Sequence, residues 1–417
     1  MRERRLTGLL ASVTAALVGV IALGAPAVAT PVSSPEAASA REALRVSTYN
    51  VSLNRPSEGQ LVADLEAGDE QAAAIAQVLQ TTRPDVVLLN EFDYDEAGEA
   101  VDLFRDEYLE VSQHGEDPIE YRYAYTAPVN TGVDSGFDLN NDGETGTADD
   151  AFGFGEFAGQ YGMVVLSRYP IDTDAVRTFQ NFLWQDMPGA LLPDDPATDR
   201  PADWYSAAEL KELRLSSKSH WDIPIEVGNT TVHVLAAHPT PPSFDGPEDR
   251  NGRRNHDEIR FWSDYVASPQ RSSYIYDDEG TTGGLKPGSR FVIVGDYNAD
   301  PEDGDSVNGA ATQLLEHPRV NDPEPVSNGA VEAAEVQGGA NAFHDGDPAL
   351  DTADFDDTAP GNLRVDYALP SKNLPVRDAG VFWPAADEPG SELTGVEPFP
   401  TSDHRSVWVD LWVPGLH

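Results

Sequence analysis

The sequence contains no cysteine and only three methionines among its 417 residues. A disulfide framework is therefore excluded, although exported proteins with small cores usually need one. A chain of this length can bury a core large enough to fold without such cross-links. We therefore expect its stability to come from the size of its core and from bound cations.

Basic residues are also scarce: 27 Lys and Arg stand against 72 Asp and Glu, which gives a formal net charge of −45. Such a surface repels the phosphate backbone of nucleic acids. Tight, sequence-independent binding to DNA is therefore unfavourable unless basic residues gather locally or salt screens the charge. The acidity suits a salty or calcium-containing medium, and it equally serves solubility alone.

Long apolar runs are absent apart from one near the N-terminus. Three arginines in the first five residues precede the apolar residues 9–23, and residues 27–29 (Ala-Val-Ala) match a signal-peptidase site. The run is too short to span a membrane comfortably. We therefore predict a signal peptide at residues 1–29, a disordered leader at residues 30–43 and a secreted, extracellular protein without a transmembrane segment.

Apolar and alternating segments predict a chain of strands and helices. Strands are expected at residues 44–51, 85–91, 162–167, 223–227, 231–237, 290–295, 364–369 and 406–413. A helix between the first two strands would begin after Asp69 and end before Pro84. A second helix is expected at residues 255–267, where Asn255 and Glu258 resemble a capping box.

The strand-helix-strand order near the N-terminus favours an α/β fold. No repeat or internal linker interrupts residues 44–413. We interpret this range as one domain with insertions near residues 113–160, 181–215 and 323–361, and we expect a monomer.

Polar residues stand where the apolar strands end or begin. They are Asn50, Glu91, His238, Asp296, Asn298, Asp403 and His404. Polar groups at the ends of buried strands are costly unless they are paired or bound to an ion. One such residue is ordinary capping of a strand, whereas several together indicate a common pocket. Carboxylates and amide carbonyls suit hard cations such as Mg²⁺, and histidine suits proton transfer near neutral pH.

Seven segments of the chain together carry a family resemblance. They are STYNV, VVLLNEFD, YGMVVLSRYPI, HPTPP, VIVGDYNADP, RVDYALPS and SDHRSVWV. In this order they resemble the endonuclease/exonuclease/phosphatase superfamily, a deoxyribonuclease-I-like group, over about residues 44–413. The resemblance implies a four-layer α/β sandwich, with two packed mixed β-sheets flanked by helices. It also implies a secreted bacterial, metal-dependent phosphoric ester hydrolase that directs water in line at a phosphomonoester or phosphodiester.

The resemblance implies a metal site and a water-activating site. Glu91 matches the metal-binding Glu of the family, with Asn50 beside it and Asp403 contributing, and the metal would be Mg²⁺ or Mn²⁺. Asp296 would orient or deprotonate the attacking water. Asn298 would hold a phosphoryl oxygen.

The resemblance also implies residues that contact the phosphate. His404, paired with Asp366, would be the general base or a phosphate-stabilising cation. His238 matches a histidine that contacts phosphate or assists the leaving group, and Tyr161 matches a tyrosine that touches the phosphate. Lys218 stands near a position where relatives place a basic residue.

Each of these residues also has a purely structural interpretation. Glu91 would then be a solvated turn residue, His238 a strand cap, Asp366 a hydrogen-bonded strand residue and Lys218 a surface residue. The family usually has Gln before the metal-binding Glu, where this chain has Asn90.

A separate acidic segment fits the pattern of a calcium-binding loop. Its candidate ligands are Asp138, Asn140, Asp142, Glu144 and Asp149. Oxygen ligands at alternate positions, with Gly143 at the sharp turn, can wrap a structural Ca²⁺ that orders an insertion. The alternative is an acidic cluster of turn residues.

A cluster of basic residues follows His238 in this otherwise acidic chain. Arg253 and His256 are candidate phosphate-binding residues, and a helix N-terminus at Asn255 would add to an anion site. The alternative is a solvated loop in which these cations balance nearby acids.

The expected substrate is a phosphoester that is small, lipid-linked or part of a nucleic acid, and the charge favours the first two. One alternative is an extracellular nuclease, which would need a strip of basic residues beside the site. A second is a non-catalytic calcium-binding extracellular module, which would explain the acidic loop but not the residues at the strand ends.

Overall fold

The computed structural model describes residues 43–307, 309–395 and 398–416. The predicted signal peptide and all but the last residue of the predicted leader lie outside these residues. Among the helices in the described ranges, none combines the length and the apolar character needed to cross a bilayer.

The first β-sheet has six strands in the order β12-β13-β1-β2-β4-β3. Their bounds are β1 Leu44–Leu53, β2 Val86–Phe92, β3 Tyr123–Tyr125, β4 Met163–Ser167, β12 Val376–Val381 and β13 Val407–Leu411. Strands β1 and β2 are parallel, and the other pairs are antiparallel. The sheet is therefore mixed.

The second β-sheet has five strands in the order β11-β8-β7-β6-β5. Their bounds are β5 Arg177–Thr178, β6 His220–Val227, β7 Thr230–Ala237, β8 Arg290–Asp296 and β11 Asp366–Pro370. Strands β7 and β8 are parallel, so this sheet is also mixed. A short ribbon of β9 (Ala353–Asp354) and β10 (Asn362–Leu363) lies outside both sheets.

The helices are short apart from α2 and α4. Their bounds are α1 Gln60–Ala67, α2 Glu70–Thr82, α3 Glu99–Leu103, α4 Arg250–Ala267, α5 Thr312–Leu315, α6 Asn328–Gln337 and α7 Ser391–Thr394. A π-helical segment, Phe104–Leu109, continues α3. Asp69 caps α2 by accepting the N–H of Ala72 at 2.7 Å, as the sequence predicts.

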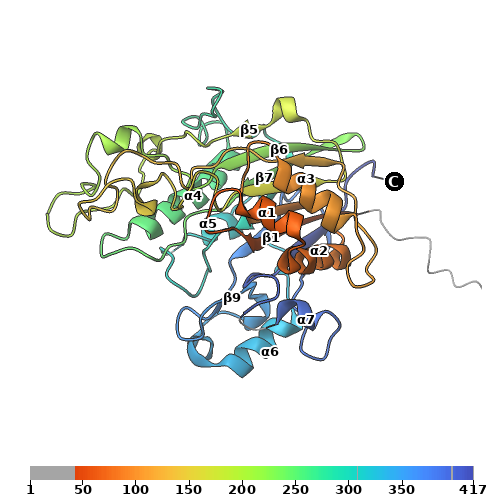
Figure 1. Ribbon diagram of the computed structural model, residues 1–417. Helices are drawn as coiled ribbons and strands as arrows, with labels where there is room; N and C mark the ends of the chain where they lie inside the picture. Colours follow the sequence, from red (N-terminus) through yellow and green to blue (C-terminus); the bar gives the residue numbers. More distant parts are fainter. Residues whose placement is uncertain (1–42, 308, 396–397, 417) are drawn as a thin grey trace, which may run out of the picture. The chain divides into compact units, whose positions relative to one another are not determined.

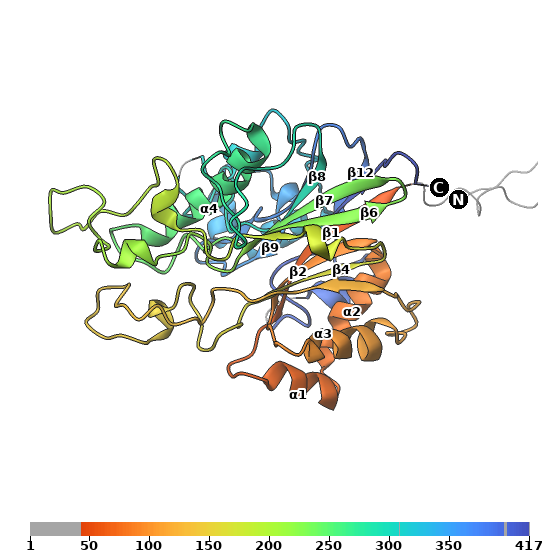
Figure 2. The same cartoon turned by 90° about the horizontal axis from the view of Figure 1, so that it is seen from above.

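The alternation of side chains in β2 explains the layers. Val86 and Leu88 pack between the two sheets, whereas Val87 and Leu89 pack with the helical residues of α1, α2 and α3. On the outer face of the second sheet, Ile293 of β8 packs with residues of α4 and α5. Figures 1 and 2 show these helices on the outer faces of the paired sheets. The predicted four-layer α/β sandwich is confirmed.

Helix α4 differs from the sequence prediction at its start. It begins at Arg250, so Asn255 and Glu258 lie inside the helix and form no capping box. The side chains of both residues are buried and bond to other parts of the fold. The predicted helix N-terminus at Asn255 is therefore wrong. Asn and Glu occur in capping boxes, but here the same residue types form tertiary hydrogen bonds instead.

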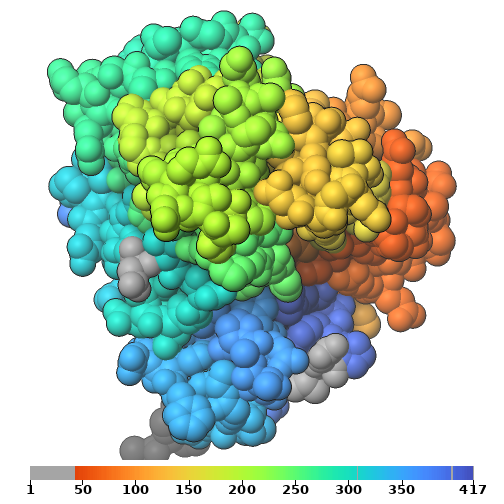
Figure 3. Space-filling model, turned by 90° about the vertical axis from the view of Figure 1, so that its left-hand side faces the viewer, coloured from red at the N-terminus to blue at the C-terminus, as the bar shows by residue number. Residues whose placement is uncertain are grey.

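Two of the predicted insertions lie side by side. The indole N–H of Trp204 donates to the Leu139 carbonyl at 3.2 Å, and Asn141 Nδ2 donates to the Trp204 carbonyl at 3.3 Å. In Figure 3, residues near 150 are golden and those near 200 are yellow-green on the same face. Residues 323–361 contain α6, which is capped by Ser327 and was not expected from composition.

Candidate active site

The sheet topology brings distant polar residues together. Asn50 and Asn90 are register partners in the parallel strands β1 and β2, so Glu91 follows directly beside Asn50. Asp366 begins β11 and pairs with Asp296, which ends the antiparallel neighbour β8. The hydrogen bond from Asn50 Nδ2 to Asp296 Oδ2, 3.1 Å long, joins the two sheets at this edge.

Asp296 is at the centre of the site and is 1% exposed. Its Oδ2 atom lies 3.4 Å from His238 Nε2 and 3.6 Å from His404 Nε2. Its Oδ1 atom accepts the N–H of Asn298 at 2.9 Å. Burial raises the pKa of Asp296 to about 6; the nearby His404 acts against this rise and Asp366 adds to it. A carboxylate with this pKa is a base near neutral pH.

His404 forms a buried pair with Asp366. His404 Nδ1 lies 2.9 Å from Asp366 Oδ2, and the hydroxyl of Thr352 donates to the same oxygen at 2.9 Å. The ring of Phe355 meets the imidazole edge-on, with 5.3 Å between centroids. Burial acts to lower the pKa of His404, but the Asp366 and Asp296 carboxylates overcome burial and raise it well above its ordinary value. His404 is therefore an imidazolium at neutral pH.

His238 is in the opposite charge state. It is 2% exposed, and its Nδ1 atom has no hydrogen-bond partner among the described residues. Burial lowers its pKa well below the ordinary value, and the charges of Lys218 and His404 lower it further. One carboxylate therefore stands between a neutral and a charged imidazole, an arrangement that separates acid and base roles.

Glu91 and Asp403 add two further carboxylates. Glu91 Oε1 accepts from Asn50 Nδ2 at 3.0 Å, and the backbone of Glu91 has φ 58°. Burial raises the pKa of Glu91, and the amide of Asn50 and the charge of His404 act against this rise. The carboxylate of Asp403 accepts long hydroxyl bonds from Ser52 and Ser402, at 3.4 and 3.3 Å.

The residues present fit a hard divalent cation. Asp296, Asp366 and His404 offer ligand atoms that all lie within 4.8 Å of one another, and among the described residues no other such group of three occurs. Because the imidazolium of His404 has no free nitrogen for a metal, the carboxylate oxygens are the ligands available. The second oxygen of Asp366 is buried without a partner. A cation would compensate the buried negative charge of these carboxylates and of Glu91, and carboxylate oxygens are the ligands that Mg²⁺ prefers.

Three more predicted residues are placed around this cluster. Asn298 has φ 50° and donates from Nδ2 to the Pro239 carbonyl at 3.2 Å, next to His238. Tyr161 has φ 55°, and its N–H donates to Asp93 at 3.0 Å. Lys218 is buried, and its ammonium forms no hydrogen bond or ion pair within the described residues.

The charges around Lys218 explain how it stays in a buried position. Burial lowers its pKa, while the carboxylates of Glu258, Glu91 and Asp296 act to raise it. Glu91 and Asp296 belong to the cluster described above. The ammonium group therefore interacts electrostatically with the same carboxylates that would face a phosphate.

The basic residues Arg253 and His256 of α4 contact acidic residues outside the cluster around Asp296. Arg253 pairs with Asp194 of an insertion at 3.6 Å, and His256 Nδ1 lies 3.1 Å from Asp257 Oδ1. These contacts correspond to the alternative in which cations balance nearby acids. A role of Arg253 and His256 in phosphate binding stays a prediction.

The predicted calcium loop is an ordered turn. Asp138 accepts the N–H groups of Asp142 at 3.1 Å and Gly143 at 2.9 Å, and Asp142 accepts from Asn140 Nδ2 at 3.0 Å. Asp149, expected as the last ligand, is exposed, while its neighbour Asp150 is buried and accepts the N–H of Leu139. Calcium binding here stays a prediction.

Sequence reasoning missed two residues that support the site. Thr352 lies in the Gly/Asp/Ala-rich stretch, where no local pattern marks it, yet it contacts Asp366. Asn90 was noted only as a departure from the family, but its Oδ1 accepts from Thr48 at 3.3 Å and from the N–H of Asp296 at 3.4 Å. Asn90 therefore joins the two sheets beneath the site.

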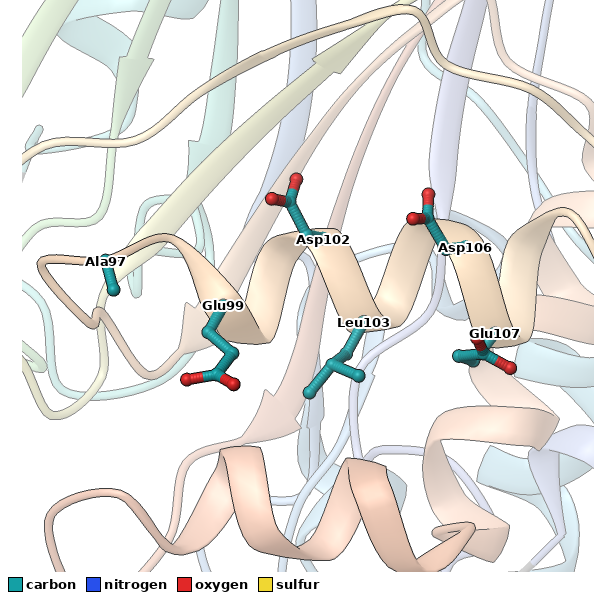
Figure 4. A pocket seen from close by; sticks show the side chains of 6 residues that line it. All are labelled: Ala97, Glu99, Asp102, Leu103, Asp106 and Glu107. Atoms are coloured by element: carbon teal, nitrogen blue, oxygen red, sulfur yellow. The ribbon is translucent and has the colours of Figure 1, made fainter.

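A separate surface hollow lies along α3 and the π-helical segment (Figure 4). It is lined by Ala97, Glu99, Asp102, Leu103, Asp106 and Glu107. Asp102 has 72% of its side chain exposed, so its charge is solvated. This hollow shares no residue with the cluster around Asp296.

Several solved structures are similar to this one. An endonuclease/exonuclease/phosphatase from Beutenbergia cavernae is 18% identical, with a TM-score of 0.49 over 90% of this chain and 73% of that one. Beta toxin from Staphylococcus aureus, solved with bound magnesium ions, is 14% identical, with a TM-score of 0.43 over 88% and 99% of the two chains. Sphingomyelinase C from Streptomyces griseocarneus is 15% identical, with the same score and coverage.

Comparisons of the sequence identify a family but no individual relative. A search of curated proteins finds no match to this chain. The model of the Endonuclease/Exonuclease/phosphatase family matches residues 47–404, which include every residue of the cluster around Asp296. The match covers most of the sequence, and the chain therefore belongs to the Endonuclease/Exonuclease/phosphatase family.

Proposed function

We propose that this protein is a metal-dependent phosphoesterase, which hydrolyses a phosphomonoester or phosphodiester by in-line attack of water. One observation carries the proposal: Asp296 Oδ2 lies within 3.6 Å of the Nε2 atoms of both His238 and His404. Members of the family are metal-dependent phosphoester hydrolases. The three side chains come from distant parts of the chain. A purely structural role at the end of a strand would not require them to lie together.

Glu91, Asp403 and Asn50 would hold Mg²⁺ or Mn²⁺. When bound, such a cation supplies positive charge that neutralises phosphoryl oxygens. Asn50 donates to both Glu91 and Asp296, so it fixes the spacing of these two carboxylates. Carboxylates that are already positioned cost little reorganisation when a substrate arrives.

The charge states support a division of the proton-handling roles. Asp296, with its pKa near 6, would accept a proton from the attacking water. His404, held as an imidazolium by Asp366, would face the developing charge on the phosphoryl oxygens. His238 is neutral and would contact a phosphoryl or leaving oxygen through a hydrogen bond. The leaving oxygen would take its proton from water when its bond to phosphorus breaks.

Neutral and cationic groups would complete the phosphate contacts. Asn298 and Tyr161 would hydrogen-bond the phosphoryl oxygens, and the ammonium of Lys218 would add a positive charge. All three are near the carboxylate cluster, and both Asn298 and Tyr161 have a positive φ. Such backbone conformations are uncommon outside glycine and often occur at functional sites.

The substrate class and location follow from sequence features. A net charge of −45 favours a small or lipid-linked phosphoester over duplex DNA. The features of residues 1–29 favour a secreted enzyme. An extracellular nuclease is the second candidate within the family, and its activity on DNA would fall steeply as salt rises.

A substrate panel tests this proposal. The purified protein is assayed with Mg²⁺, Mn²⁺ or Ca²⁺ on plasmid DNA, bis-p-nitrophenyl phosphate, p-nitrophenyl phosphate, sphingomyelin and phytate. The substitutions Asp296→Ala and His404→Ala should each lower turnover by at least about a hundredfold, the scale of one catalytic acid or base. Equal turnover by the wild type and both variants would contradict the mechanism.

A further inference from the structure

One face of α4 presents three buried polar side chains toward the segments that carry the site. Arg254, Asn255 and Glu258 are 9%, 0% and 1% exposed. A buried carboxylate is costly unless hydrogen bonds compensate it. The hydrogen bonds of these residues therefore indicate why polar side chains occupy these buried positions.

Glu258 joins two segments of the site with one carboxylate. Its Oε1 atom accepts the N–H of Ser217, and its Oε2 atom accepts the N–H of Thr240, both at 2.7 Å. Ser217 directly precedes Lys218, and Thr240 lies two residues after His238. The two backbone segments are thereby held at a fixed separation by short, charge-assisted bonds.

Asn255 extends the same contact to a third segment. Its Nδ2 atom donates to the carbonyls of Thr240 and Tyr297, both at 2.8 Å. Tyr297 lies between Asp296 and Asn298, the two residues that end and follow β8. One turn of α4 therefore contacts the backbone beside His238, Lys218 and Asp296.

Arg254 secures the chain that leads into Ser217. Its guanidinium donates to the carbonyls of Leu215 at 2.8 Å, Arg214 at 3.0 Å and Phe152 at 2.5 Å. These three carbonyls accept hydrogen bonds from the buried guanidinium, and the charge of Glu258 on the same helix also interacts with it. The Ser217 segment is thus held from both sides by the same helix.

We propose that Glu258 is a positioning residue, which sets the relative placement of His238 and Lys218 beside Asp296. The inference rests on the proposed phosphoesterase function and deepens it. Two N–H donors need two acceptor oxygens, and a carboxylate supplies both. A glutamine has only one acceptor oxygen, so its amide nitrogen would face an N–H and repel it.

Glu258 also has an electrostatic effect on the site. Among the charges that counteract the lowering of the Lys218 pKa by burial, that of Glu258 is the strongest, followed by Glu91 and Asp296, while Arg254 acts in the opposite direction. Removing the Glu258 charge weakens the support for a charged Lys218. A substitution at Glu258 should therefore weaken phosphate binding as well as turnover.

A matched control separates this role from the packing of α4. Asp264 lies on the same helix and is 2% exposed. Its carboxylate pairs with Arg260 at 3.1 Å, Arg271 at 3.3 Å and Tyr274 at 2.9 Å. None of these partners belongs to the site. Both Glu258→Gln and Asp264→Asn remove one buried charge from α4, but only the first removes contacts with the site segments.

The experiment compares Glu258→Gln and Asp264→Asn with the wild type, using bis-p-nitrophenyl phosphate and Mn²⁺. We expect Glu258→Gln to lower kcat/KM by at least about tenfold and to raise KM, on the scale seen for residues that orient catalytic groups. A partly unfolded sample lowers the apparent kcat without raising KM. Asp264→Asn should stay within about twofold of the wild type per folded protein.

Amide hydrogen exchange gives a second readout that does not need turnover. The Ser217 or Thr240 amide should exchange faster in Glu258→Gln but not in Asp264→Asn. Should Glu258→Gln fail to fold, Glu258→Asp keeps the charge while its shorter side chain loses one of the two amides, and the same two effects are expected.

The outcomes distinguish the two proposals. An active wild type whose kcat/KM is matched by a folded Glu258 variant overturns the positioning role alone, as does unchanged exchange at both amides. A wild type that hydrolyses no phosphoester overturns the proposed function and the positioning role with it.

Discussion

His404 and Asp366 form a buried pair that joins the two β-sheets, with 2.9 Å between Nδ1 and Oδ2. Asp366 begins β11 in the second sheet, while His404 lies just before β13 in the first. The pairing leaves the other ring nitrogen, Nε2, directed at Asp296. Asp366 therefore orients the imidazole and, together with Asp296, keeps it charged.

Asp366→Asn tests this relationship directly. Asparagine preserves the shape of the side chain but removes the charge that raises the pKa of His404. We expect kcat to fall by at least about a hundredfold, because the imidazole loses its hydrogen-bonded carboxylate and the strongest of the charges that raise its pKa. Initial rates on bis-p-nitrophenyl phosphate from pH 5 to pH 9 measure the effect. Unchanged rates across this range would rule out a role for the pair.

Thr352 offers a second test of the same pair. Its hydroxyl donates to Asp366 Oδ2 at 2.9 Å and accepts the N–H groups of Val365 at 3.0 Å and Asp366 at 2.9 Å. Thr352→Val keeps the volume but leaves both N–H groups without this acceptor. We expect a loss of at least about 1 kcal/mol in the free energy of unfolding, and a lower kcat.

The control for this prediction is Thr352→Ser, which retains the hydroxyl. Chemical denaturation and steady-state rates should show Thr352→Ser close to the wild type in both measurements. If Thr352→Val and Thr352→Ser behave alike, the hydroxyl does not support Asp366.

The apolar patterns of the strands were sufficient to predict an α/β fold, and the family resemblance added the two packed sheets. The strands β3, β5 and β12 were not expected. Strand β2 shows the apolar pattern well: Val87 and Leu89 face the helices, while Val86 and Leu88 face the second sheet. Continuous apolar runs predict such doubly covered strands. Polar residues stand near the carboxyl ends of β1, β2, β7 and β8, so part of the candidate cluster was also visible along the chain.

The supporting contacts could not be predicted in the same way. Glu258 and Asn255 looked like a capping box because capping and tertiary hydrogen bonds use the same residue types. Their partners, Ser217 and Thr240, lie in loops whose positions depend on the packing of α4. Thr352 was likewise hidden, since it comes close to Asp366 through the short ribbon in which Ala353 of β9 pairs with Leu363 of β10.

Asp351 is predicted to lower the stability of the protein at alkaline pH. Its carboxylate is 7% exposed and forms no hydrogen bond or ion pair within the described residues. Burial raises its pKa from 3.8 to about 8, and the charges of Asp300, Asp303 and Asp347 add to the rise. The folded state therefore binds a proton that the unfolded state releases near pH 4.

The sign of the pH dependence follows from this raised pKa. The stability from the protonated form is fully present below about pH 4 and is lost as the pH rises toward 8. Asp351→Asn stays neutral, so its advantage over the wild type should grow by at least about 1 kcal/mol between pH 5 and pH 8. Urea unfolding with a chelator measures it, with the exposed Asp345→Asn as control. A constant difference at all pH values would contradict the prediction.

Calcium should order the loop at residues 138–149. Asp138 and Asp142 already bond the backbone of the turn, so a cation would add contacts among carboxylates that otherwise repel one another. We expect Ca²⁺ to slow cleavage of this loop by a nonspecific protease and a chelator to reverse the effect. Asp138→Asn should abolish the protection, whereas Asp296→Ala, in the separate cluster, should retain it. Equal cleavage with and without Ca²⁺ would leave only an acidic turn.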